Sequence, residues 1–218
     1  DVERSRGLGD VYKRQGLLFR DFQFNQSVSG MALELRKSFD QFNGRDVVYG
    51  FDTETLETER FRNSTLTSLI TGIPTSNVYG TIYPSKTLPN TDTTRTGIYY
   101  SDRINFDEFN ILSYGIRYDS YKLDPNDDAL SSANRAVGYP LAEIDENELS
   151  FKFGWLSAVT EEINAFFQYA EGFKAPDYDS ANLSFNNLAY GYGIVPNADL
   201  SPETSKGTEI GFRGDNGV

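Results

Sequence analysis

Clustered carboxylates are the residues of this sequence that could do chemistry most directly. Asp124, Asn126, Asp127 and Asp128 bring oxygen-bearing side chains close together, and hard cations such as Ca²⁺ prefer several oxygen ligands. The segment lacks the glycine and the distant bidentate glutamate of an EF-hand loop. We therefore interpret it as a solvated loop tip, and we expect no metal site.

Two further pairs, Asp145–Glu146 and Glu161–Glu162, have the composition of paired catalytic carboxylates. Both lie beside predicted turns, where we expect them to be solvated. The sequence contains no histidine and no cysteine, which excludes a Ser-His-Asp triad, a His-ligated or thiolate-ligated zinc site and disulfides. The net charge of -12 argues against nucleic acid, whose phosphates need clustered Lys and Arg. We expect neither a catalytic residue nor a nucleic-acid partner.

The elements that must position any functional side chain are strands. In residues 112–118 and 149–155, apolar or aromatic side chains alternate with polar residues or glycine. This period of two is typical of a β-strand with two different faces. The 14% aromatic content also favours strands over helices. No run of about 18 apolar residues occurs, so a transmembrane helix is not expected.

Connection lengths suggest how the strands are arranged. Short turns are predicted near 40–44, 107–110 and 160–162, whereas long polar stretches fill 61–91, 123–146 and 174–203. This alternation is typical of a transmembrane β-barrel, which has short periplasmic turns and long outer loops. We expect an all-β fold, a partial antiparallel up-and-down transmembrane β-barrel of about seven strands, each about 9 to 11 residues long. The first clear strand is expected at 31–39, and the sheet is expected to run from about residue 30 to 212.

The alternation also predicts which side chains share a face. The lipid-side, convex face is expected to carry Tyr114, Ile116, Tyr118, Phe151, Phe153 and Trp155. The concave face is expected to carry Arg117, Asp119 and Lys152.

The N-terminal residues form a separate segment in this interpretation. Residues 10–15 resemble a translated transposase adaptor from sequencing libraries, so we set 1–15 aside as a non-native segment and treat 16–218 as the domain. The Asn-Gly turn near the end of the sequence is followed by almost nothing. We expect the chain to be an internal fragment of a longer protein.

Two segments carry a resemblance to a known family. Residues 168–176 read QYAEGFKAP, and residues 195–205 read VPNADLSPETS. The pair resembles the Phe-Arg-Ala-Pro and Asn-Pro-Asn-Leu boxes of TonB-dependent outer-membrane receptors, in particular the haem and haemoglobin receptor branch. Lys174 stands where the first box usually has Arg, and Ala198 where the second usually has Pro. The matching positions are Phe173, Lys174, Ala175, Pro176, Pro196, Asn197, Ala198, Asp199 and Leu200.

The resemblance implies a barrel of about 22 strands with a plug in its lumen, of which the plug and the other strands are absent from this chain. It implies a location in the outer membrane of a Gram-negative-type bacterium. The expected partners are outer-membrane lipid, a TonB complex reached through the missing plug, and haem, a haemoprotein or a ferric siderophore as transported ligand. No intrinsic cofactor is expected. Both boxes are expected to position the loop between them rather than to touch ligand.

The loop between the boxes lacks the axial histidine that haem receptors of this type generally supply. Tyr178, Tyr190 and Tyr192 lie there instead, and a tyrosine phenolate can bind haem iron. We expect weak or no haem binding by the fragment, and any residual binding is expected to depend on these tyrosines. Loop packing is the alternative role for each of them.

A soluble alternative stays open at this point. A secreted β-rich carbohydrate-binding or hydrolytic domain would also show alternating strands, but it would bury one sheet face in a core. A barrel would instead turn an apolar stripe toward lipid.

Overall fold

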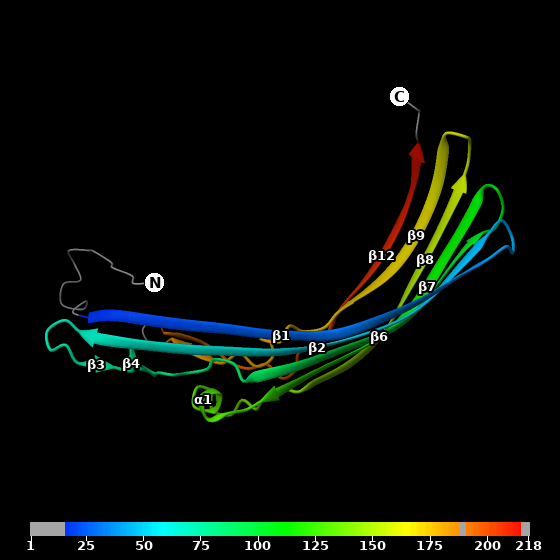
Figure 1. Ribbon diagram of the computed structural model, residues 1–218. Helices are drawn as coiled ribbons and strands as arrows, with labels where there is room; N and C mark the ends of the chain where they lie inside the picture. The colour runs from blue at the N-terminus through cyan, green and yellow to red at the C-terminus, as the bar shows by residue number, and fades with distance from the viewer. Residues whose placement is uncertain (1–15, 188–190, 215–218) are drawn as a thin grey trace.

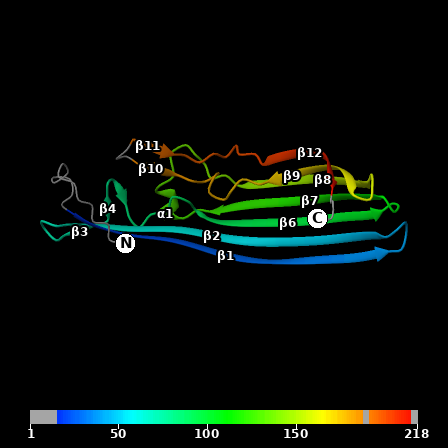
Figure 2. The same cartoon turned by 90° about the horizontal axis from the view of Figure 1, so that it is seen from above.

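The chain forms one curved antiparallel sheet (Figure 1). The computed structural model describes residues 16–187 and 191–214. Within them, seven long strands lie side by side in chain order (Figure 2). These are β1 (Gly16–Phe39), β2 (Arg45–Ser68), β6 (Asn90–Asn105), β7 (Asn110–Asn126), β8 (Ile144–Ala158), β9 (Ile163–Lys174) and β12 (Glu203–Gly214). The expected all-β, up-and-down sheet of about seven strands is confirmed.

Short elements occupy the long connections. They are β3 (Pro74–Thr75), β4 (Asn77–Val78), β5 (Thr81–Ile82), α1 (Ala129–Ser132), β10 (Phe185–Asn187) and β11 (Tyr192–Ile194). Because neighbouring strands are antiparallel, the three long connections all leave from the same end of the sheet, as expected (Figure 1). We call this the outer end, and the opposite end the short-turn end. No helix in the described part of the chain is long and apolar enough to cross a membrane.

Strand lengths differ from the prediction. β1 and β2 are 24 residues long and pair over their whole length, whereas about 9 to 11 residues were expected. β1 begins at Gly16 rather than near residue 30, and β2 continues to Ser68 through a stretch predicted to be loop. The alternation was obscured there because the outer half of β2 is mostly polar, whereas apolar residues of the outer half of β1, such as Leu17 and Phe22, fall on both faces.

The short turns are fixed by backbone geometry and by one carboxylate. Gly44 adopts φ +110°, a value that L side chains rarely adopt, and so it closes the turn between β1 and β2. At the next turn, Asp107 accepts hydrogen bonds from the side chain of Asn110 at 2.9 Å and from the backbone N–H of Phe109 at 2.8 Å. These bonds hold the pKa of Asp107 below its usual range.

One face of the sheet carries an apolar band. The register places Leu33, Phe51, Ile98, Tyr118 and Leu149 directly opposite one another in one row across the strands. The next row toward the short-turn end holds Leu35, Tyr49, Tyr100, Ile116 and Phe151. Opposed residues of paired strands share a face, so we call this the apolar face.

The other face is polar and tightly packed. Arg117 donates to Asp52 and to Asp119 at 2.8 to 2.9 Å, and Tyr99 donates to Glu34 at 2.8 Å. A Cβ at Gly97 would collide with the Arg117 guanidinium, and one at Gly50 would collide with the Tyr99 ring. The predicted separation of Tyr114, Ile116, Tyr118, Phe151, Phe153 and Trp155 from Arg117, Asp119 and Lys152 is confirmed. Lipid contact by the first set stays a prediction.

A charged pair interrupts the apolar face close to the short-turn end. The carboxylate of Asp102 is fully buried and accepts bonds from Arg45, Tyr100 and Tyr114. It lies three residues before the end of β6. The charge of this buried carboxylate is balanced by Arg45 and by its hydrogen-bond donors, and the two middle rows of the apolar face are free of charge from β1 to β8. In β9 and β12, Glu171 and Lys206 share this face and form an ion pair at 3.2 Å.

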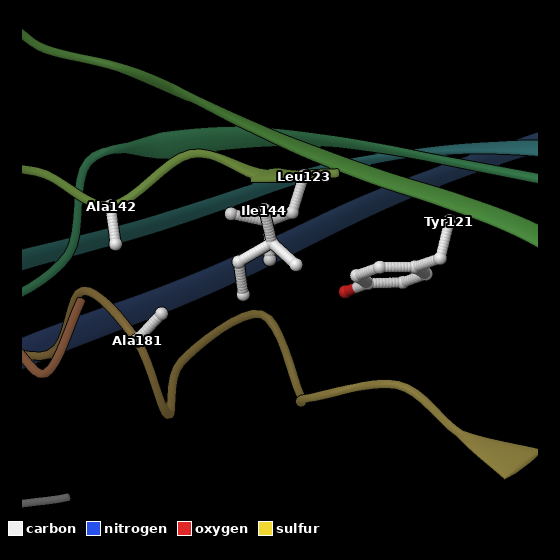
Figure 3. Close-up of a cluster of buried hydrophobic side chains, with 5 residues drawn as sticks. All are labelled: Tyr121, Leu123, Ala142, Ile144 and Ala181. Carbon is white, nitrogen blue, oxygen red and sulfur yellow. The ribbon is translucent and has the colours of Figure 1, made fainter. Parts of the chain in front are cut away.

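Five buried apolar side chains form a small cluster at the outer half of the sheet, on its polar face. It contains Tyr121, Leu123, Ala142, Ile144 and Ala181 (Figure 3). Large apolar residues on the other face stay exposed, including Leu33 at 59% and Leu35 at 60%. A soluble domain would bury that face in a core, so the structure does not support the soluble alternative.

Candidate functional site

The loop between β9 and β12 is the centre of the candidate site, and its two ends meet. Asn197 donates its backbone N–H to the carbonyl of Ala181 at 2.9 Å. Phe173, Ala175 and Leu200 all pack against the buried cluster that contains Ala181. The structure therefore brings the two sequence boxes together at the base of this loop, although they are separated by about 20 residues of sequence.

The remaining box residues lie around this base. Pro196 is buried, whereas Asn197, Ala198 and Asp199 are exposed. The ammonium of Lys174 lies 3.7 Å from the carboxylate of Asp177, and both side chains are exposed. β9 ends at Lys174, two residues before Pro176, which cannot donate to a ladder.

The loop crosses the polar face because β9 separates from β8. Their pairing stops at Lys152 and Ala170, although both strands continue. Beyond that point, the hydroxyl of Tyr121 donates to the carbonyl of Pro176 at 2.8 Å. The amide of Asn182 forms two 2.8 Å bonds with the backbone of Ala142. These bonds tie the loop to β7 and to the connection before β8.

Further along, the loop meets two arginines of β2. The guanidinium of Arg60 lies 5.5 Å from the ring of Phe24 and 5.4 Å from the ring of Tyr178. The guanidinium of Arg62 lies 5.3 Å from the ring of Phe22 and 5.6 Å from the ring of Phe185. In each case one ring belongs to β1 and the other to the loop. We call these six residues the arginine–aromatic cluster.

The register explains why the cluster forms. Phe22 pairs with Arg62, and Phe24 pairs with Arg60, so all four side chains share one face of the β1–β2 ribbon. Guanidinium groups within about 6 Å of aromatic rings are attracted to them, by roughly 0.5 to 2 kcal/mol for each contact. The two contacts with Tyr178 and Phe185 hold the loop over the polar face, and the two contacts with Phe24 and Phe22 hold the arginines against β1.

The two arginines differ in their polar partners. Arg60 donates to the hydroxyl of Tyr178 at 2.6 Å and lies 3.4 Å from the carboxylate of Asp179. Arg62 is half-buried, and its side chain forms neither an ion pair nor a hydrogen bond with the residues that the structure describes.

The three candidate tyrosines have different environments. Tyr178 is partly buried, and its hydroxyl is occupied by Arg60. Tyr192 is 54% exposed, and its ring centroid lies 6.1 Å from that of Phe185. Tyr190 lies outside the described residues. Tyr178 and Tyr192 thus reach the same cluster, through Arg60 and through Phe185.

The aspartates of the 124–128 segment are used for structure. Asp128 caps α1 through the backbone N–H groups of Leu130 and Ser131. Its other oxygen accepts from the ammonium of Lys86 at 2.7 Å. Asp127 pairs with Arg135 at 2.8 Å. No group of three or more acidic residues suited to a metal ion occurs within 16–187 and 191–214.

Lys86 connects two long loops to the sheet. Its side chain is only 6% exposed, and its ammonium bonds Glu59 at 3.2 Å, Asn90 at 2.8 Å and Asp128 at 2.7 Å. Burial opposes the charged form of Lys86, but the bonds to Asp128 and Glu59 outweigh it and raise its pKa. Burial likewise acts against the charged form of Asp128, but the bond from Lys86 lowers its pKa overall.

We expect Lys86→Met to release α1 and the loop that contains it. Hydrogen bonds to charged groups contribute about 1.5 to 3 kcal/mol each, and the half-exposed partners reduce this to roughly 1 to 2 kcal/mol of local stability. Hydrogen exchange at Leu130 and Ser131 should therefore speed up about tenfold in the full-length protein. Lys122→Met is the matched control, because its ion pair with Asp145 is exposed on both sides.

The Lys86 contact should also depend on pH in a defined direction. The pKa of Asp128 is lowered, so its contribution is present above the usual Asp range and is lost as pH falls through the lowered value. The pKa of Lys86 is raised, so its contribution is lost only as pH rises above the usual Lys range. Protection that collapsed between pH 5 and 8 would contradict this assignment.

Sequence reasoning missed the strand half of the site. Arg60 and Arg62 lie close to the start of the stretch predicted to be loop, and Phe22 and Phe24 precede the first expected strand. The signal was present in the sequence as two period-two pairs, Phe22 with Phe24 and Arg60 with Arg62. Only the register of β1 with β2 shows that the two pairs lie opposite each other.

Comparison with known proteins identifies the architecture. Residues 3–218 match the family described as TonB dependent receptor-like, beta-barrel. The chain is similar in structure to the ferric citrate transporter FecA in its unliganded form, with 17% identity and a TM-score of 0.58. That similarity covers 93% of this chain and 28% of FecA.

A second similar structure is a double mutant of the Serratia marcescens hemophore receptor HasR, in complex with its hemophore HasA and heme. It is 16% identical, with a TM-score of 0.61, and the similarity covers 88% of this chain and 30% of HasR. The chain therefore spans less than a third of either protein. No curated protein sequence matches it.

Proposed function

Because the chain belongs to the TonB-dependent receptor-like β-barrel family, we propose that it is a sector of an outer-membrane receptor that takes up an iron-containing nutrient. The family is located in the outer membrane of Gram-negative bacteria, and its members transport ligands rather than catalyse reactions. The observation that carries the proposal is the sheet itself, with an apolar band on one face, whose two middle rows are uncharged from β1 to β8, and a network of ion pairs on the other face. This arrangement suits a wall between lipid and a wet lumen.

The proposal assigns the remaining parts of the receptor to the parent protein. Residues 16–218 would be a partial barrel, and the plug, the other strands and the contact with TonB would lie elsewhere in the parent. The coverage of 28% of FecA and 30% of HasR supports this size relation. Residues 1–15, which resemble an adaptor, lie outside the described residues, and their foreign origin stays a proposal.

We favour haem or haemoglobin as the ligand over a ferric siderophore. The support is the pair of boxes at the base of the β9–β12 loop and the tyrosines that this loop carries. In this proposal the boxes hold the loop, and Tyr178, Tyr190 or Tyr192 would be the iron ligand. Tyr178 would have to exchange its bond with Arg60 for iron.

A ferric siderophore is the second candidate, and the arginine–aromatic cluster favours it. Arg60 and Arg62 place two positive charges on the polar face of a chain whose net charge is -12. An acidic iron chelate would be attracted to these charges. FecA and HasR do not decide between the two ligands, since both are similar in fold alone.

Growth under iron limitation tests the proposed function. A strain carrying the complete receptor and a matched deletion strain are grown with haem or with a ferric siderophore as the sole iron source, each with and without TonB. We expect growth on haem to require both the receptor and TonB. If growth requires the receptor and TonB on the ferric siderophore but not on haem, the second candidate is established. If growth requires neither protein on either iron source, the proposal is contradicted.

A further inference from the structure

Arg62 differs from the other buried or half-buried arginines because it has no carboxylate partner among the described residues. Arg45 is paired with Asp102, Arg117 with Asp52 and Asp119, and Arg135 with Asp127. Arg62 has no such partner among the described residues. A half-buried guanidinium without a carboxylate is unfavourable, especially in a chain with 32 acidic residues available to pair with it.

The backbone holds Arg62 firmly in this position. Its N–H donates to the carbonyl of Ser85 at 3.0 Å, and its carbonyl accepts from the N–H of Ser85 at 2.9 Å. Beyond the end of the β2–β6 pairing at Thr58, Ser85 takes the place of β6 beside β2. The side chain of Arg62 is therefore presented from a paired strand, on the polar face, within reach of the rings of Phe22 and Phe185.

The contacts of the Arg62 guanidinium with the rings of Phe22 and Phe185 indicate which kind of ligand group it can bind. Rings attract the faces of a planar guanidinium, whereas its N–H groups point outward in its own plane. These N–H groups match the two oxygens of a carboxylate in a bidentate pair. A lysine ammonium would offer only a point charge at the same place.

We propose that Arg62 binds a carboxylate of the transported iron compound, with Phe22 and Phe185 contacting the same ligand group. This rests on the proposed function and names the chemistry that the site recognises. Haem carries that chemistry in its propionates, and α-hydroxycarboxylate iron chelates carry it as their iron-binding groups. Arg60 is less suited to the role, because its Nη2 already donates to the hydroxyl of Tyr178 at 2.6 Å and lies 3.4 Å from the carboxylate of Asp179.

Ligand titration of the complete receptor in detergent tests the assignment. The probes are haem, haem whose two propionates are esterified, and ferric citrate, and the variants are Arg62→Gln, Arg62→Lys and Arg20→Gln. Arg20 lies on the same face of the ribbon, opposite Ser64, and is exposed. It therefore controls for the general loss of one positive charge. Unchanged heat-modifiable mobility shows that each variant is folded.

We expect Arg62→Gln to weaken binding of one carboxylate probe about 10-fold to 100-fold, and Arg62→Lys to weaken it less. Arg20→Gln should change it by less than about twofold, since exposed charges interact weakly. Esterified haem should bind the native receptor and Arg62→Gln equally. The probe that Arg62→Gln weakens identifies the source of the carboxylate, a propionate or a chelate.

Two results would overturn the assignment of Arg62. One is equal affinity of the native receptor and Arg62→Gln for both carboxylate probes. The other is an equally large loss of affinity of Arg62→Gln for haem and for esterified haem, which would mean that Arg62 only holds the loop. A native receptor that binds none of the probes would instead overturn the proposed ligand class, and the assignment with it.

Discussion

Phe151→Lys should destabilise the complete receptor strongly, whereas Ser150→Lys in the next position should be tolerated. Phe151 lies in the second row of the apolar band, opposite Ile116, and Ser150 lies on the polar face, opposite Arg117. A lysine at the lipid-facing midplane of a barrel costs about 2 to 4 kcal/mol, and loss of the phenylalanine adds to this. On the polar face, the same lysine stays in contact with water.

Urea unfolding of the receptor in lipid vesicles measures the difference. Gel mobility without heating reports the folded fraction at each urea concentration. The two substitutions add the same charge to adjacent residues of β8, and the repulsion of Ser150→Lys by Arg117 opposite it costs roughly 0.2 to 1 kcal/mol, less than a lysine facing lipid. Equal destabilisation by both would contradict the assignment of the two faces.

The second prediction with a large effect concerns the behaviour of this chain without the rest of the receptor. Expressed alone, residues 16–218 should not insert into lipid as a stable monomer. Among the residues that the structure describes, the sheet ends at β1 on one side and at β12 on the other, so each of these strands has an edge without a neighbouring strand. Within lipid, every unpaired backbone N–H or carbonyl costs several kcal/mol, and these edges run the length of the two strands.

Refolding into detergent micelles and then vesicles provides the measurement. A fragment that requires its missing neighbours should show no heat-modifiable, protease-resistant monomer, whereas the complete receptor should show one under the same conditions. A compact monomer of the fragment would contradict this prediction. It would also show that the two edges can close on each other.

The strand order and the faces were predictable, because they follow from local signals. Short turns and period-two alternation in β7 and β8 determine which strands are neighbours and which side chains lie opposite. Residues 25–29 of β1 and the facing part of β2 lacked that signal, because Asn25, Ser27 and Ser29 oppose Glu59, Glu57 and Thr55 on the face that is apolar further along the strands. A strand segment without a clear period of two cannot be distinguished from a loop by periodicity.

The candidate site was predictable only in part, because it is built from distant segments. The boxes around Phe173 and Pro196 indicated where the loop begins and ends. Nothing local indicated that β9 would leave β8 after Ala170, and this separation lets the loop cross to β2. The contact of Tyr178 with Arg60 joins residues 118 positions apart, so it depends on the register of every strand between them.

Single-cysteine labelling in intact cells tests the central claim most directly. The chain has no cysteine, so Val137→Cys in the 127–143 loop and Glu108→Cys in a short turn each add one thiol to this part of the receptor. Val137 is 99% exposed. A membrane-impermeant maleimide should label Val137→Cys on whole cells and label Glu108→Cys only after the outer membrane is opened. Labelling of both on intact cells, or of Glu108→Cys alone, would contradict an outer-membrane barrel with these loops outside.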